Sequence, residues 1–171
     1  MSSSTEISAQ GVVVPGIEGL NKAREFTLNL AKDVEPGQMC VRSSPGANHA
    51  AYVLGHIAWT DDAFISMLGG GPSKLPEGWA EKFGYSLEIT DNTSDYPGKD
   101  EMLKVMRERR EALIEWLGSL SEAELLKPIE GDFAGFARTL AALPSTLAFH
   151  EGFHAGQLSA CRRALGIERM F

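Results

Sequence analysis

The chain has 171 residues, 43% of them hydrophobic, which suits one domain with a buried core and leaves little room for a second. Its net charge of −7 argues against nucleic-acid binding, which normally needs a concentrated basic face. The sequence contains only two cysteines, has no apolar run of membrane-spanning length, and starts with polar residues that do not form a secretion signal. We therefore expect a soluble, cytoplasmic protein.

The N-terminal part of the chain divides into a polar start and a helical pattern. Residues 1–16 begin with a short serine-rich stretch, and we expect them to be disordered. Residues 17–171 form the single expected domain. Its first helix is expected over residues 17–32, where apolar residues recur on one side, and Pro36-Gly37 stops it.

A second helix and a long connection follow. We expect this helix to be capped by Ser44 or Asn48 and to end at Leu68, just before three consecutive glycines. Residues 69–98 are rich in Gly, Pro, Asp, Asn and Thr and show no sustained period, so they predict a connection with at most a short helical turn at 79–83.

The C-terminal half predicts two more long helices. One is expected over residues 99–120, followed by a capping box at 121–124 that opens a short extra turn. The last is expected over residues 144–165, with 139–143 as a separate turn and Gly166 as a left-handed residue past its end. Four long helices without alternating strands predict an all-α fold, a four-helix bundle with a long connection between the second and third helices.

Two histidines on the last helix carry the strongest chemical signal. His150 and His154 are four residues apart on the apolar stripe, so their side chains share one face within reach of one ion. A buried imidazole without a partner costs about 1–3 kcal/mol, and a metal ion satisfies both rings at once. Bonds to carbonyls, waters or acids are the alternative. His56, on an inward flank of the second helix, is the expected third ligand, because bundles gather ligands from facing helices.

Several polar residues near these histidines allow more than one interpretation. The segment also matches His-Glu-x-x-His of zinc peptidases, but only Glu168 lies beyond it as a third ligand, so Glu151 is expected at the surface or beside a ligand. Gln157 is expected to contact a ligand. Asp61 and Asp62 either orient a histidine or belong to a solvated face.

Other residues are expected to serve the fold. Arg107, Arg109 and Arg110 alternate with glutamates and are read as a solvated helix face. His49 is expected at a helix start or a pocket rim. Cys161 lies within an apolar stripe, where a thiol acts as a small hydrophobe.

At these residues the sequence resembles the DinB-like superfamily, metal-binding four-helix bundles related to bacterial thiol S-transferases. The resemblance rests on Leu-Gly-His-Ile-Ala-Trp at residues 54–59 and on His-x-x-x-His-x-Gly-Gln-Leu at 150–158, followed by Arg162-Arg163 and Gly166. It covers most of the chain, from about Ile17 to the end.

The resemblance implies a metal site at His56, His150 and His154 holding zinc or nickel. It also implies an up-up-down-down bundle and a homodimer. Some members of this superfamily use the ion to activate a small thiol such as bacillithiol or mycothiol.

Two functions follow as hypotheses. The first is a metal-dependent enzyme acting on a small molecule, most simply a small-thiol S-transferase or a hydrolase, for which Glu151, Asp61 and Asp62 are weak candidates as general base. The second is a non-catalytic metal-binding or stress-response bundle whose metal is structural or absent. A closed structural zinc site normally has four protein ligands, and no fourth is evident here, which favours an open site.

Overall fold

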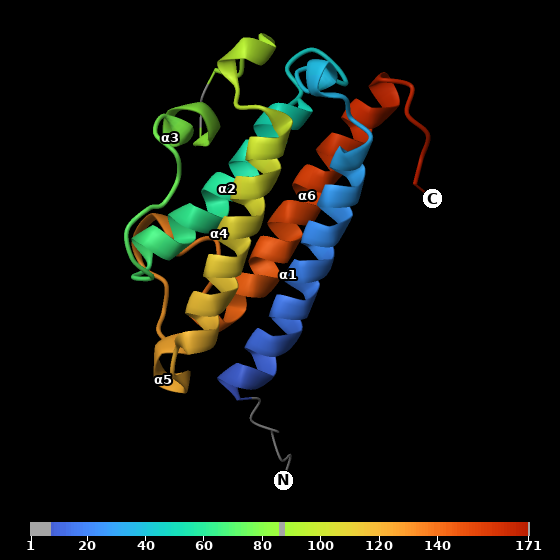
Figure 1. Cartoon of the computed structure of the whole chain (residues 1–171). Coiled ribbons are helices and arrows are strands. Elements are labelled where there is room, and N and C mark those ends of the chain that lie inside the picture. The colour runs from blue at the N-terminus through green and yellow to red at the C-terminus, as the bar shows by residue number, and fades with distance from the viewer. Residues whose placement is uncertain (1–7, 86–87, 171) are drawn as a thin grey trace.

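The computed structural model of the chain describes residues 8–85 and 88–170. Within this part of the chain, four long helices form a bundle (Figure 1): α1 Ala9–Lys32, α2 Ala50–Met67, α4 Lys99–Ser119 and α6 Leu143–Ala164. Short helices lie in the connections: 3-10 turns at Pro36–Gln38, Thr93–Asp95, Gly131–Phe133 and Leu140–Ala142, and α-helices α3 Trp79–Phe83 and α5 Glu122–Leu125. The described residues contain no strand, so the predicted all-α bundle with a long second connection is confirmed.

Helices α1 and α6 run side by side in the same direction (Figure 1). At one end of this pair Gly16 lies against Pro144, and at the other the Arg162 guanidinium donates to the Leu30 carbonyl at 2.7 Å. The glycine allows close contact, since a Cβ at this position would lie 3.0 Å from the Pro144 side chain. The first and last helices therefore form one half of the bundle.

Helices α2 and α4 form the other half and run opposite to the first. They are parallel to each other, because Asp61 of α2 pairs with Arg110 of α4, and Gly70, just past the end of α2, lies against Trp116 near the end of α4. The order is thus up, down, down, up (Figure 1), and the up-up-down-down arrangement implied by the resemblance is wrong. The physical reason is that residues 33–49 stay at one end of the bundle, whereas the connection after α2 returns the chain along its length.

Helix α1 begins earlier than the sequence predicted. Ser8 caps it by accepting the amide of Gly11 at 3.1 Å, and both Ala9 and Val13 are buried. The expected disorder is therefore wrong for residues 9–16, and residues 1–7 lie outside the described residues. Helix α1 continues through Pro15, because its apolar side packs against α5 and α6.

Most of the predicted helix ends agree with the structure. The short helix at residues 79–83, the capping box that Ser121 forms with Glu124, the turn before α6 and the left-handed Gly166 are all present. The cap of α2 was predicted wrongly. His49 takes that place, with its Nδ1 accepting the amide of Tyr52 at 3.1 Å.

Helix α2 is buried on nearly every side. Two clusters of buried apolar residues meet along it, one around Leu54 and Ile57 and the other around Phe64. Trp79 and Phe83 from the long connection cover the side that the other long helices leave open. A polar residue on α2 therefore sits inside the protein. Among the described residues no helix combines the length and apolar character needed to cross a membrane.

Candidate metal centre

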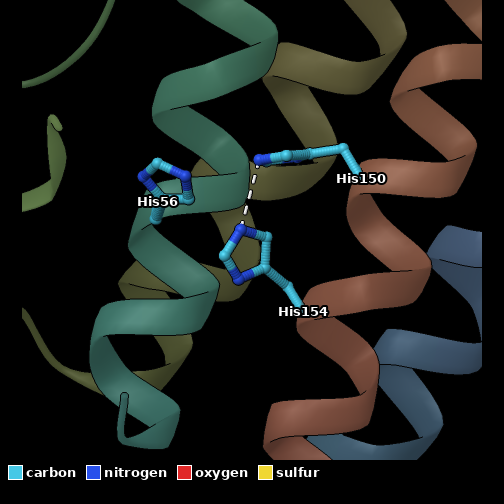
Figure 2. Close-up of side chains that lie close together, drawn as sticks. All are labelled: His56, His150 and His154. Carbon is cyan, nitrogen blue, oxygen red and sulfur yellow. Dashed lines mark hydrogen bonds between the residues drawn. The ribbon is translucent and has the colours of Figure 1, made fainter. Parts of the chain in front are cut away.

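Helices α2 and α6 bring together the three histidines that the sequence singled out (Figure 2). One nitrogen from each of His56, His150 and His154 lies within 4.8 Å of the corresponding nitrogens of the other two. His56 and His154 are buried, and His150 is half-buried. The ring of His56 lies 5.4 Å from that of His150 and 4.8 Å from that of His154, so the two turns of α6 that carry these histidines face the turn of α2 that carries His56. The three side chains form a group that can hold a metal ion.

Hydrogen bonds fix which nitrogen two of the rings present. His56 Nδ1 lies 2.7 Å from the Phe83 carbonyl, which only accepts, so Nδ1 carries the proton and Nε2 a lone pair. His154 Nδ1 lies 2.9 Å from Gln157 Oε1. The Asn48 amide donates to the same oxygen at 3.1 Å, which identifies that atom as an acceptor. His154 therefore also presents the lone pair of Nε2, and the predicted role of Gln157 agrees with this contact.

The ring of His150 forms a hydrogen bond with the ring of His154. His150 Nε2 and His154 Nε2 are 3.2 Å apart (Figure 2), and one of the two must donate. Since His154 Nε2 carries a lone pair, His150 donates. Moving that proton to His150 Nδ1 would turn all three Nε2 atoms into ligands. Three imidazoles suit zinc, nickel, copper or iron, so the donor set fits a divalent ion.

Burial keeps these rings neutral. It is the main cause that lowers the pKa of His56 to about 4 and the pKa of His150 to about 3, and the adjacent imidazoles add to both shifts. Burial also lowers the pKa of His154, although the bond to Gln157 opposes it. Metal binding requires the neutral imidazole, which is the form present at neutral pH.

A tight contact between α2 and α3 positions His56. A Cβ added at Gly55 would lie 2.1 Å from the Phe83 ring, so only glycine lets α3 approach this closely. The Trp79 indole donates to the Gly55 carbonyl at 3.1 Å and fixes the same contact. The Phe83 carbonyl thereby reaches His56. Sequence analysis missed this partner, and the small residue preceding His56 was the available signal.

Four buried charges lie behind the histidines. We call Arg24, Asp61, Arg110 and Glu151 the charge cluster. Glu151 accepts from Arg24 Nε at 2.8 Å and from Arg110 at 2.7 Å, and Asp61 accepts from the same two arginines at 2.9 and 3.0 Å. Two positive and two negative charges balance, which is what burial of charge requires.

The charge cluster corrects three predictions. Glu151 is not at the surface, Arg110 is not on a solvated face, and Asp61 orients no histidine, since all three are at most 4% exposed and both carboxylates bind Arg110. Burial by itself would raise the pKa of Glu151, but Arg24 and Arg110 outweigh it and the pKa is lowered. An ion-paired carboxylate is not free to act as the base of a zinc peptidase. Sequence analysis did not notice Arg24, although it lies on the inward stripe of α1.

Asp62 has a separate partner. Its carboxylate accepts from Arg109 at 3.2 Å and from the Lys74 amide at 3.1 Å, which ties the long connection to α2 and α4. Asp62 therefore does not orient a histidine either.

Aromatic rings surround the metal centre. Trp59 stacks on His56 with centroids 5.6 Å apart, and Tyr85 meets the edge of both His56, at 5.5 Å, and Trp59, at 4.9 Å. Phe136 meets His150 at 5.7 Å and Phe153 meets His154 at 5.5 Å. The outer side of the three imidazoles is thus lined by aromatic side chains.

The sequence and the fold both have known relatives. The sequence matches the model of the DinB superfamily over residues 20–158, which is most of the chain. The fold is similar to the crystal structure of a conserved protein from Enterococcus faecalis, with a TM-score of 0.70 at 17% identity over 90% of this chain and 97% of that one. No protein of curated function matches the sequence. The histidine cluster and these matches together fit a metal-binding helical protein.

Proposed function

The chain belongs to the DinB superfamily, and on this premise we propose that it is a metal-dependent enzyme of small-thiol S-transferase type. His56, His150 and His154 hold a divalent ion, zinc or nickel. The observation that carries the proposal is the convergence of three neutral imidazoles within 4.8 Å of one another.

The number of ligands supports an open site. Among the described residues, the group of His, Cys, Asp and Glu side chains close enough to share one ion has three members. Structural zinc sites are usually closed by four protein ligands, whereas catalytic sites use three and leave a position for water or substrate. Cys161 does not complete the set, because its thiol donates to the Asn48 carbonyl at 3.3 Å.

The surrounding carboxylates favour a thiol as nucleophile. Asp61 and Glu151 are held by two arginines, so neither of these candidate bases is free to take a proton, and Asp62 is ion-paired with Arg109 through one of its two oxygens. A divalent ion lowers the pKa of a thiol or water that reaches it and produces a nucleophile at neutral pH. A thiol, already far more acidic than water, needs no protein base for this. Gln157 and the Phe83 carbonyl hold two of the rings in the ligand orientation.

Cobalt substitution tests the proposal. We expect cobalt-loaded protein to change its visible absorption saturably when a small thiol such as cysteine is added, and His150→Ala to lose both cobalt and response. His49→Asn is the matched control, because it changes the fourth histidine and retains a side chain that can cap α2. A cobalt spectrum that is indifferent to thiols would support the alternative, a non-catalytic metal-binding bundle.

The outer face of α6 supports the homodimer that the resemblance implies. Phe149 and Phe153 are 77% and 61% exposed, which is unusual for two large apolar side chains one turn apart. Gly152 and Gly156 beside them leave room for a second helix. We propose that this face pairs with that of a second copy. Light scattering should give the mass of a dimer for the natural chain and that of a monomer for Phe149→Ser.

A further inference from the structure

We propose that a cavity beside the metal centre binds the apolar, aromatic part of the substrate and disfavours substrates with negative charge. The cavity has a volume of about 440 Å³, within the usual range of small-molecule sites. Its assignment to the substrate rests on the proposed function. Binding of an aromatic molecule there does not, because none of the three histidines lines the cavity.

The cavity and the metal centre share a wall. Trp59, Tyr85 and Phe136 line the cavity, and the same three rings contact the imidazoles of His56 and His150. A molecule held against these rings lies next to the ligands of the ion. The cavity is therefore placed to present a bound molecule to the metal centre.

Two of the aromatic rings that line the cavity are held in place by contact with the hydrophobic core. Phe133 and Phe136 pack against Phe64 of α2 with centroids 4.6 and 4.7 Å apart, and Phe64 is fully buried in the core. These rings keep their positions without a ligand, so a bound molecule loses little free energy in ordering them. By contrast, Met67 and Tyr85 on the same cavity are 60% and 52% exposed, and a ligand would cover this apolar surface.

The charge of the lining selects among aromatic ligands. Among the described residues that line the cavity, Asp132 is the one that carries a charge, and none is Lys, Arg or His. The faces of aromatic rings carry negative potential, so they attract cations, and the carboxylate acts in the same direction. An uncharged or cationic aromatic molecule fits this surface, and an aromatic anion is repelled from it.

Three probes with one ring and different charge test the inference: benzyl alcohol, benzylamine and benzoate, titrated into metal-free protein by NMR. Metal-free protein is used because an amine or a carboxylate would otherwise bind the ion. We expect saturable shifts of cavity residues with the alcohol and the amine, and binding of benzoate at least tenfold weaker. Asp132→Asn should reduce that difference.

Two variants test whether the probes bind in this cavity. Gly135 lines it and has open space where a Cβ would be, so Gly135→Leu should fill it and weaken benzyl alcohol binding at least tenfold. Gly118→Leu is the matched control on α4, where a Cβ also meets nothing within 4 Å, and should leave binding unchanged. Tyr85→Ala removes one wall and should also weaken binding.

The outcomes separate this inference from the proposed function. Absence of saturable benzyl alcohol binding, benzoate binding as tightly as benzylamine, or binding that survives both Gly135→Leu and Tyr85→Ala would overturn the inference. Metal content of the loaded protein is measured on the same variants and should not change. Protein that binds the probes but no metal would contradict the proposed function and leave the aromatic site standing.

Discussion

Replacing Glu151 by glutamine should destabilise the protein strongly, although the two side chains have almost the same shape. Glu151 is 1% exposed and accepts from Arg24 at 2.8 and 3.3 Å and from Arg110 at 2.7 Å. A glutamine has one acceptor oxygen where the carboxylate has two, and its amide group would face a guanidinium. The charge cluster would change from two positive and two negative charges to two and one.

The size of the effect follows from the cost of an unpaired buried charge. Removing one partner of a buried ion pair destabilises proteins by about 3–5 kcal/mol. In a protein of this size each kcal/mol lowers the melting temperature by about 2–4 °C. We therefore expect Glu151→Gln to melt about 6–20 °C below the natural chain, a difference that circular dichroism or calorimetry resolves easily.

A matched control separates burial from charge. Glu25 forms an ion pair with Lys22 at 2.8 Å, but their side chains are 61% and 80% exposed, so Glu25→Gln should leave the melting temperature unchanged within the scatter of the measurement. Equal melting temperatures for Glu151→Gln and the natural chain would refute the structural role of the charge cluster. Loss of activity at an unchanged melting temperature would instead restore Glu151 as a general base.

Three further substitutions or reactions probe the surroundings of the metal centre. Gly55→Ala should cost about 1–3 kcal/mol and weaken metal binding, because its methyl group would displace the Phe83 ring. Gly118→Ala, in open space on α4, should cost nothing in a melting experiment. Gln157→Leu should lower metal affinity about 10–100-fold in a chelator competition, since it removes the hydrogen-bond partner of the ligand His154. The melting temperature should not change. Unchanged metal affinity would contradict the role of Gln157 in orienting His154. Burial raises the pKa of the Cys161 thiol, so its alkylation by iodoacetamide should be slow at neutral pH. The reaction should accelerate only at a higher pH than for an ordinary thiol. Native protein that is modified as fast as unfolded protein, as measured by mass spectrometry, would contradict this.

The parts of the structure that follow helical periodicity could be predicted from sequence. The four long helices were found because apolar residues recur every three to four positions, and the convergence of the histidines followed from the i,i+4 spacing of His150 and His154 together with a facing helix. Local capping rules identified the ends at Ser121 and Gly166. Apart from the facing position of His56, each of these depends on residues that are close in sequence.

The errors involve partners far apart in sequence. Glu151 was expected at the surface or beside a ligand because it points about 100° away from His150 around the helix. Its partner Arg24 lies 127 positions away. The partner of His56 is a backbone carbonyl, that of Phe83, and only Gly55 beside His56 hinted at the close approach. Residues 9–16 were expected to be disordered after the serine-rich start, whereas packing against the rest of the bundle extends α1 through them. In each case the feature depends on a tertiary contact, which the local sequence pattern does not reveal.

The central claim is that three histidines hold one ion, and elemental analysis of the purified, metal-loaded chain tests it most directly. We predict about one zinc or nickel ion per natural chain, its loss in His56→Ala, His150→Ala and His154→Ala, and its retention in His49→Asn. All four variants should first be shown to be folded by circular dichroism. Natural protein that holds no ion after loading, or folded variants of the three histidines that retain it, would contradict the account.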